Sequence, residues 1–187
     1  MSDSDDVRRQ LLDAARSAYA ARGFIATTFK GVAAAAGVAP EVARNYYDSR
    51  EELFAAAMRL PFEPASALQA LLAPGLDGMG ERLVRTTMSM FSDPQTREQL
   101  AELVRAGAGA SKATAAMREF LDVAVVDRAA TALGVPDARM RVVLATSYLL
   151  GAATSRYVLK LEPLASASDE EVVRLLAPVV QATLTGH

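Results

Sequence analysis

The stretch VAAAAGVAPEVARNYYDSREELF, residues 32–54, contains two short segments joined at a glycine, followed by the start of a third. Gly37 is suited to end the first segment, because glycine readily adopts the left-handed conformation that closes a helix. Pro40 is typical of a first helical turn. Ser49 with Glu52 three residues later forms the pattern of a capping box at a helix start. These signals predict helices over about 28–36 and 40–47, and a third from residue 49 onward.

The sequence on either side of this stretch also has helical periodicity. Apolar Val7, Leu11 and Ala18 recur at helical spacing and Gly23 follows them, which predicts a helix over about 4–22. No later segment alternates as a strand would. The last three helices are expected near 112–133, 137–161 and 169–184. We therefore expect an all-α fold of about nine to ten helices.

The composition excludes several classes of protein. The 187 residues, 51% of them hydrophobic, suffice for a substantial core. Cysteine is absent and the single histidine is the last residue, so we expect neither a metal site nor a disulfide framework. The sequence has no Walker loop or nucleophile elbow, and we expect no enzyme and no cofactor. The acidic start MSDSDD is unlike a signal peptide, and no uncharged run is long enough to span a membrane; we expect a cytoplasmic protein.

Charge is distributed unevenly along the chain, whose net charge is −2. Residues 8–59 carry eight basic and five acidic side chains, a net +3, whereas residues 61–187 carry twelve and fourteen, a net −2. A mildly basic N-terminal segment is compatible with nucleic-acid binding there, and an ordinary solvated surface would have the same balance.

Two short helices joined by a glycine-containing turn match a helix-turn-helix, whose second helix enters the major groove. In a helix over 40–47, Ala43 and Tyr47 share an inward face. The opposite face carries residue types that bond base edges. Residues flanking it, with the helix start at Thr28, could bond phosphates. The alternative is a solvated helix of a plain bundle. The candidate DNA-binding residues are Thr28, Pro40, Glu41, Arg44, Asn45, Tyr46 and Arg50.

Residues 8–58 resemble the N-terminal domain of TetR-family transcriptional regulators. The resemblance is carried, in order, by LLDAARSAYAARGF, TT, VAAAAGV, NYY and SREELF. Four positions depart from the family pattern: Ala39 replaces a capping Ser or Thr, Arg44 a Tyr, Tyr47 a Phe and Arg50 a Lys. These departures leave the operator sequence open. The segment RYVLKLEPLASASDEEVVRLLAP resembles the C-terminal region of many actinobacterial members.

The resemblance implies a body that binds a small-molecule effector and pairs with a second copy. Residues 142–155 are apolar nearly all round, which is compatible with a core on one side and an interface on the other. The alternative is the central helix of a monomer. The candidate interface residues are the small Gly151, Ala152 and Ser155. The candidate pocket residues are Met88, Phe91, Met117, Phe120 and Tyr148, each of which could equally be plain core.

The expected organisation is a helix-turn-helix domain over 1–48, a connecting helix over 49–60 and a ligand-binding and dimerisation domain over 61–187. The expected function is a ligand-responsive regulator, most simply a repressor, that binds a near-palindromic DNA operator as a homodimer and is released by a small molecule. The alternative is a helical dimer that binds small molecules or proteins and has lost DNA binding, for which Ala39 and Arg44 would be the signs.

Overall fold

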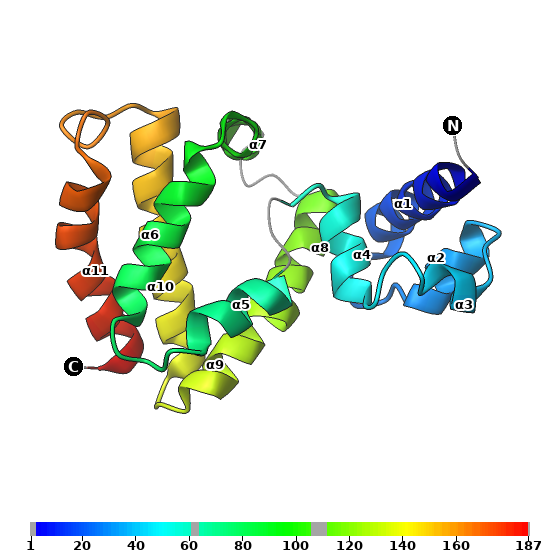
Figure 1. Cartoon of the computed structure of the whole chain (residues 1–187), viewed down its shortest axis with the longest axis horizontal. Coiled ribbons are helices and arrows are strands. Elements are labelled where there is room, and N and C mark those ends of the chain that lie inside the picture. Colours follow the sequence, from blue (N-terminus) through cyan, green and yellow to red (C-terminus); the bar gives the residue numbers. More distant parts are fainter. Residues whose placement is uncertain (1–2, 61–63, 106–111, 187) are drawn as a thin grey trace. The chain divides into compact units, whose positions relative to one another are not determined.

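The computed structural model describes residues 3–60, 64–105 and 112–186. Every regular element in these ranges is a helix, which confirms the all-α prediction (Figure 1). Contacts divide the chain into two compact units. Unit 1 comprises residues 1–67 and 109–125, and unit 2 comprises residues 68–108 and 126–187. The predicted functional boundaries after residues 48 and 60 stay a prediction.

Unit 1 has helices from two separate parts of the chain. They are α1 (Asp3–Arg22), α2 (Phe29–Ala35), α3 (Pro40–Ala43), α4 (Arg50–Ala57), α8 (Lys112–Leu121) and all but the last residue of the π-helical η1 (Asp122–Val126). The turn between α2 and α3 closes as the sequence predicts. Gly37 has φ +70°, and the N–H groups of Gly37 and Val38 donate to Ala34 and Ala33 over 3.1 and 3.0 Å. Glycine permits this left-handed closure without steric cost.

Helix α3 is shorter than the predicted 40–47. After Ala43 the backbone tightens: the N–H groups of Asn45 and Tyr46 donate to the carbonyls three residues earlier, each over 3.1 Å. Such tight final turns are common at helix ends. Ala39 precedes the helix and supplies no side-chain cap, so its first turn is held by backbone bonds alone, among them the Ala43 N–H to the Ala39 carbonyl over 3.0 Å.

The start of α4 is capped nearly as predicted. Ser49 Oγ accepts the Glu52 N–H over 3.0 Å. The Glu52 carboxylate accepts the N–H of Asp48, over 2.7 Å, one residue before the position that a capping box requires. Both bonds still satisfy donors at the helix start.

An aromatic cluster forms the centre of unit 1. Phe54 of α4 lies 4.7 Å from Tyr19, 5.1 Å from Phe24 and 4.4 Å from Phe120, measured between ring centroids. Phe120 comes from α8 and its side chain is completely buried, as is that of Ala116 one turn earlier. The core of the helix-turn-helix unit is therefore completed by a helix from far along the chain.

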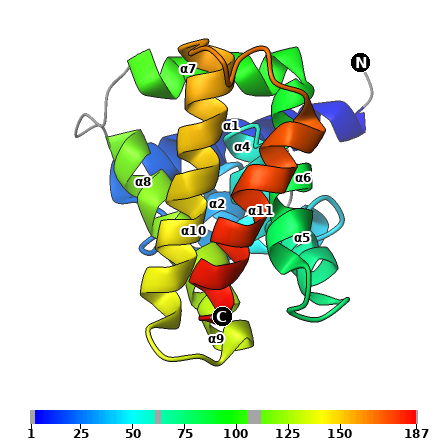
Figure 2. The same cartoon turned by 90° about the vertical axis from the view of Figure 1, so that its left-hand side faces the viewer.

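Unit 2 is built on long helices that pack side by side, α6 (Met79–Ser92), α10 (Ala138–Ala153) and α11 (Asp169–Thr185), seen face-on in Figure 2. The other helices are α5 (Pro64–Leu72), α7 (Pro94–Arg105), α9 (Asp127–Leu133) and the π-helical η2 (Thr154–Val158). The last three predicted helical segments are confirmed. Apolar side chains including Val84, Leu149 and Val180 fill the core between these helices.

Candidate DNA-binding surface

The outward face of the α2–α3 motif carries the polar residues that the sequence predicts. Glu41, Arg44 and Asn45 are exposed, whereas Ala43 and Tyr47 are buried in the core of unit 1. This orientation leaves the groups that can bond base edges free to meet a partner. Val42 was not among the predicted residues, yet its exposed side chain adjoins this face and could contact a thymine methyl group.

Arg44 connects the two helices of the motif. Its guanidinium lies 5.3 Å from the centroid of the Phe29 ring, at the start of α2. A cation over an aromatic face is attracted electrostatically and is held in a narrower range of orientations than a free side chain. The contact therefore orients an exposed cation on the outward face.

The two adjacent threonines divide their roles. Thr28 Oγ1 accepts the Gly31 N–H over 3.0 Å and caps α2, while the residue itself stays exposed. Thr27 is fully buried and its hydroxyl donates to the Gly23 carbonyl over 2.7 Å. A capped helix N-terminus carries partial positive charge, so the start of α2 is suited to receive a phosphate.

The two adjacent tyrosines tie α3 to the start of α1. The Tyr46 hydroxyl donates to Ser4 Oγ over 3.3 Å. Tyr47 Oη accepts from Arg8 Nε over 3.4 Å, and this hydrogen bond is the main cause that raises the pKa of Arg8. Tyr46 is half-buried, so its phosphate contact stays a prediction.

Arg50 makes extensive contacts inside unit 1. Its guanidinium lies 4.1 Å from the Phe24 ring centroid and donates to the carbonyls of Ile25 and Thr27 over 3.4 and 3.5 Å. Its backbone carbonyl accepts the Tyr19 hydroxyl, and burial raises the pKa of that tyrosine, which keeps it a donor. The arginine thus orders the turn before α2, and its phosphate contact stays a prediction.

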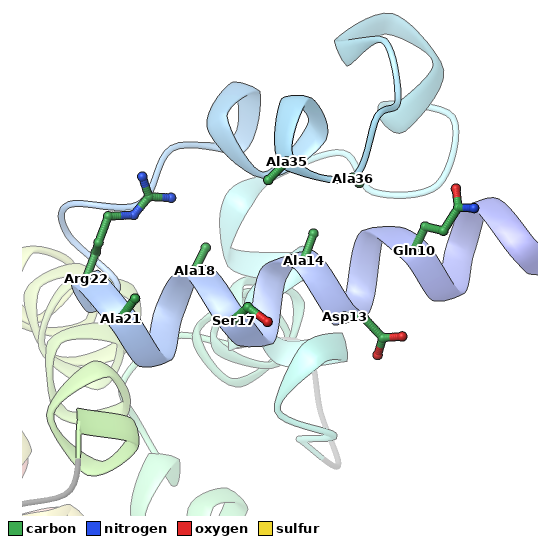
Figure 3. A pocket seen from close by; sticks show the side chains of 9 residues that line it. All are labelled: Gln10, Asp13, Ala14, Ser17, Ala18, Ala21, Arg22, Ala35 and Ala36. Atoms are coloured by element: carbon green, nitrogen blue, oxygen red, sulfur yellow. The ribbon is translucent and has the colours of Figure 1, made fainter.

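A groove of about 720 Å³ lies between α1 and α2 within unit 1 (Figure 3). Arg22 stands at one end and Gln10 at the other, with small side chains between them. Alanines at these positions leave the space that larger residues would fill. The remaining lining residues are Asp13, Ala14, Ser17, Ala18, Ala21, Ala35 and Ala36.

The predicted pocket residues are placed in both units. Met117 and Phe120 pack in the core of unit 1. Met88 and Phe91 are buried in unit 2, in two different apolar clusters. Tyr148 is exposed on α10. Their role as a pocket lining stays a prediction.

The predicted interface residues lie on or next to an uncovered side of α10. Gly151 is exposed, and a Cβ added there would have nothing within 4 Å, whereas Ala152 and Ser155 are half-buried. The larger apolar side chains nearby were not among the predicted interface residues, because helical periodicity alone does not distinguish the buried from the exposed side of α10. These exposed residues are Met140, Val143, Leu144, Tyr148 and Leu150 on α10, and Leu175 and Val179 on α11.

Two further searches concern other kinds of site. Within residues 3–60, 64–105 and 112–186, no three His, Cys, Asp or Glu side chains are grouped so that they could hold a metal ion. Over the same described part of the chain, no helix combines the length and the hydropathy needed to cross a membrane.

Two family models match parts of this chain. The family model "Bacterial regulatory proteins, tetR family" matches residues 11–57, and "Tetracyclin repressor-like, C-terminal domain" matches residues 77–184. A solved TetR-family regulator from Streptomyces coelicolor A3 is 36% identical over 99% of this chain and 98% of its own, with a TM-score of 0.53. No curated protein matches the sequence.

A solved structure from Mesorhizobium loti MAFF303099 is 16% identical over 100% of this chain and 98% of its own, with a TM-score of 0.52, and shares the fold. The α2–α3 motif lies inside the N-terminal match, and α6, α10 and all but the last residue of α11 lie inside the C-terminal one. This chain therefore belongs to the TetR family of bacterial DNA-binding transcriptional regulators.

Proposed function

We propose that the protein is a homodimeric repressor that binds a near-palindromic operator through α3 and is released by a small-molecule effector. The observation that carries the DNA-reading part is the exposed set Glu41, Arg44 and Asn45 above buried Ala43 and Tyr47. An arginine bonds guanine, an asparagine adenine and a carboxylate the cytosine amino group. Thr28, Pro40, Tyr46 and Arg50 flank this set as candidate backbone contacts.

Selection of bound duplexes from a random pool tests the proposal. We expect the full-length protein to enrich a near-palindrome whose half-sites are one helical turn apart, because a two-fold dimer presents two copies of α3. The salt dependence of the affinity then separates phosphate contacts from base contacts. If the pool yields no enrichment and binding is weak and salt-sensitive, the protein is instead a helical dimer whose N-terminal unit has lost operator recognition.

Arg44→Ala is expected to weaken binding to the selected duplex by about 1–3 kcal/mol while relaxing preference at one base pair. The reason is that an exposed guanidinium on this face can bond guanine in bidentate geometry. Titration of the duplex and of single-base variants measures the effect. An equal loss on every sequence, with a shallower salt slope, would assign Arg44 to a phosphate instead. Arg128→Ala on α9, an exposed arginine outside the α2–α3 motif, is the control.

The homodimer is supported by the exposed apolar side chains of α10 and α11. Leu175 is 64% exposed and Met140 62%, although both lie on helices whose other sides fill the core of unit 2. Contiguous apolar surface of this kind marks association sites. The two helices lie side by side, so their outer sides can join those of a second copy around a two-fold axis (Figure 2).

Leu175→Asp is expected to convert the protein from dimer to monomer at micromolar concentration, because a carboxylate buried in an apolar interface is strongly disfavoured. Sedimentation equilibrium measures the mass. Operator affinity should fall in parallel, since each monomer offers a single α3. Arg128→Asp on α9, exposed and outside this face, is the control. A variant that sediments as a dimer would contradict the proposed interface.

Effector release is proposed as a coupling between two binding events. Within unit 2, the candidate lining residues Met88 and Phe91 are both buried. If effector weakens operator binding by some factor, operator must weaken effector binding by the same factor. A compound library screened for release of the selected duplex tests the proposal, and a compound that binds tightly without changing operator affinity would count against it.

A further inference from the structure

Residues 23–28 form the turn that leads from α1 into α2. Two side chains of opposite charge, Glu119 and Arg50, form hydrogen bonds to the backbone of this turn. The N–H of Ile25 donates to Glu119 Oε2 over 2.9 Å. The carbonyl of the same residue accepts from Arg50 Nη1 over 3.4 Å. Arg50 belongs to α4, whereas Glu119 belongs to α8 and lies 94 residues after Ile25 in the sequence. Both polar groups of one exposed residue are thus tied to side chains from different helices.

The turn is shaped to accept the carboxylate. A Cβ built at Gly23 would lie 2.6 and 2.9 Å from the two carboxylate oxygens of Glu119. Gly23 also has φ +80°, a conformation that favours glycine. The carboxylate therefore occupies space that any larger residue at position 23 would take.

The position of Glu119 is set by its neighbour. Phe120 is fully buried, stacked on Phe54 at 4.4 Å and set edge-on to Phe24 at 5.2 Å. Phe24 lies in the same turn as Ile25. An aromatic pair of this kind restricts rotation and sliding of the helix that carries it. The packing of Phe120 consequently holds the Glu119 carboxylate against the Ile25 amide.

We propose that Glu119 is a positioning residue for DNA binding: its carboxylate fixes the Ile25 amide and thereby holds the turn that sets how α2 leaves α1, and with it the α2–α3 motif. The inference rests on the proposed operator binding. Ile25 stands three residues before Thr28, which caps α2. Because Ile25 is 61% exposed and the bond to Glu119 is exposed too, loss of the bond should change the fold little and the geometry of the turn more.

The test compares Glu119→Gln with Glu119→Ala in the full chain. Both variants remove one negative charge, so their general attraction to DNA rises equally. Glutamine keeps an oxygen that can accept the Ile25 N–H, whereas alanine does not. We expect the alanine variant to bind the selected duplex about 3–10-fold more weakly than the glutamine variant, the range of one hydrogen bond. Arg118 is an exposed neighbour on α8 and serves as the control. We expect Arg118→Ala to change the affinity for the selected duplex only through the loss of one positive charge.

Hydrogen exchange of the Ile25 amide, followed by NMR, is the second readout, because a residue with a purely structural role would not alter it selectively. We expect faster exchange in Glu119→Ala, near wild-type exchange in Glu119→Gln, and equal unfolding midpoints. Should the alanine variant fail to fold, Glu119→Leu replaces it, since leucine also removes the charge and offers no acceptor for the Ile25 N–H.

Equal operator affinity of the glutamine and alanine variants overturns the proposal, as does unchanged exchange at Ile25. If the wild type itself selects no duplex, the proposed operator binding fails. The exchange comparison then still decides whether Glu119 fixes the turn.

Discussion

Phe120→Ala is expected to lower the free energy of unfolding of unit 1 by about 3–5 kcal/mol, the range for truncating a fully buried phenylalanine. The side chain has no exposed surface and contacts the rings of Phe24 and Phe54. Its removal leaves a cavity between α1, α4 and α8 that these helices cannot close without losing the aromatic contacts. A loss of this size approaches the whole stability of a small domain.

Urea unfolding followed by circular dichroism measures this change, and hydrogen exchange assigns it to unit 1. Leu121→Ala is the matched control, because Leu121 adjoins Phe120 on α8 but is partly exposed to solvent. We expect Leu121→Ala to lower the free energy of unfolding far less. We also expect Phe120→Ala to lose operator binding, because α2 and α3 pack against this core. A stability equal to that of the control would show that α8 does not complete unit 1.

Gly80→Ala is expected to destabilise unit 2 by about 3 kcal/mol, the upper part of the usual cost of overpacking. An added Cβ would lie 2.4 Å from the Ala177 carbonyl oxygen and 2.7 Å from the Gln181 nitrogen. Both are backbone atoms of α11, so no side-chain rotation can relieve the contact. Helices α6 and α11 would have to separate.

Separation would also break two hydrogen bonds. The Gly80 N–H donates to Gln181 Oε1 over 2.8 Å, and Gln181 Nε2 donates to the Leu76 carbonyl over 3.0 Å. Denaturant unfolding measures the change in the free energy of unfolding, and hydrogen exchange of the α6 and α11 amides assigns it to these helices. Thr86→Ala, on an exposed position of the same helix, is the control and should stay within about 0.5 kcal/mol of the wild type. A stable Gly80→Ala protein would show that the two helices approach less closely.

Much of the helix-turn-helix could be predicted because its signals are local. Gly37 closes α2, Ser49 caps α4 and Pro40 opens α3, each through bonds to residues at most five positions away. The inward face of Ala43 and Tyr47 followed from helical spacing alone. The end of α3 was predicted too late, because a four-residue helix has too few bonds for periodicity to mark its boundary.

The site surroundings were harder to predict because they depend on contacts between distant residues. Arg50 stays a predicted phosphate contact, but the sequence does not reveal that its guanidinium stacks on Phe24 and bonds the turn before α2. Phe120 stays a predicted pocket residue, and the sequence does not reveal that its ring packs against Phe24 and Phe54. The sequence contains no local mark that distinguishes an aromatic buried in one unit from an aromatic lining another.

The sequence by itself determined the helical class, most helix boundaries near glycine, proline and capping residues, and the polar face of α3, because these follow from backbone conformation and from a 3.6-residue period. Only the tertiary structure decided that α8 completes the core of unit 1, that Glu119 reaches the Ile25 amide, and which side of α10 stays uncovered. The physical reason is that the hydrophobic effect is non-directional and does not depend on how far apart two residues are in the sequence. Many apolar residues are therefore equally suited to a given contact until the whole fold brings two of them together.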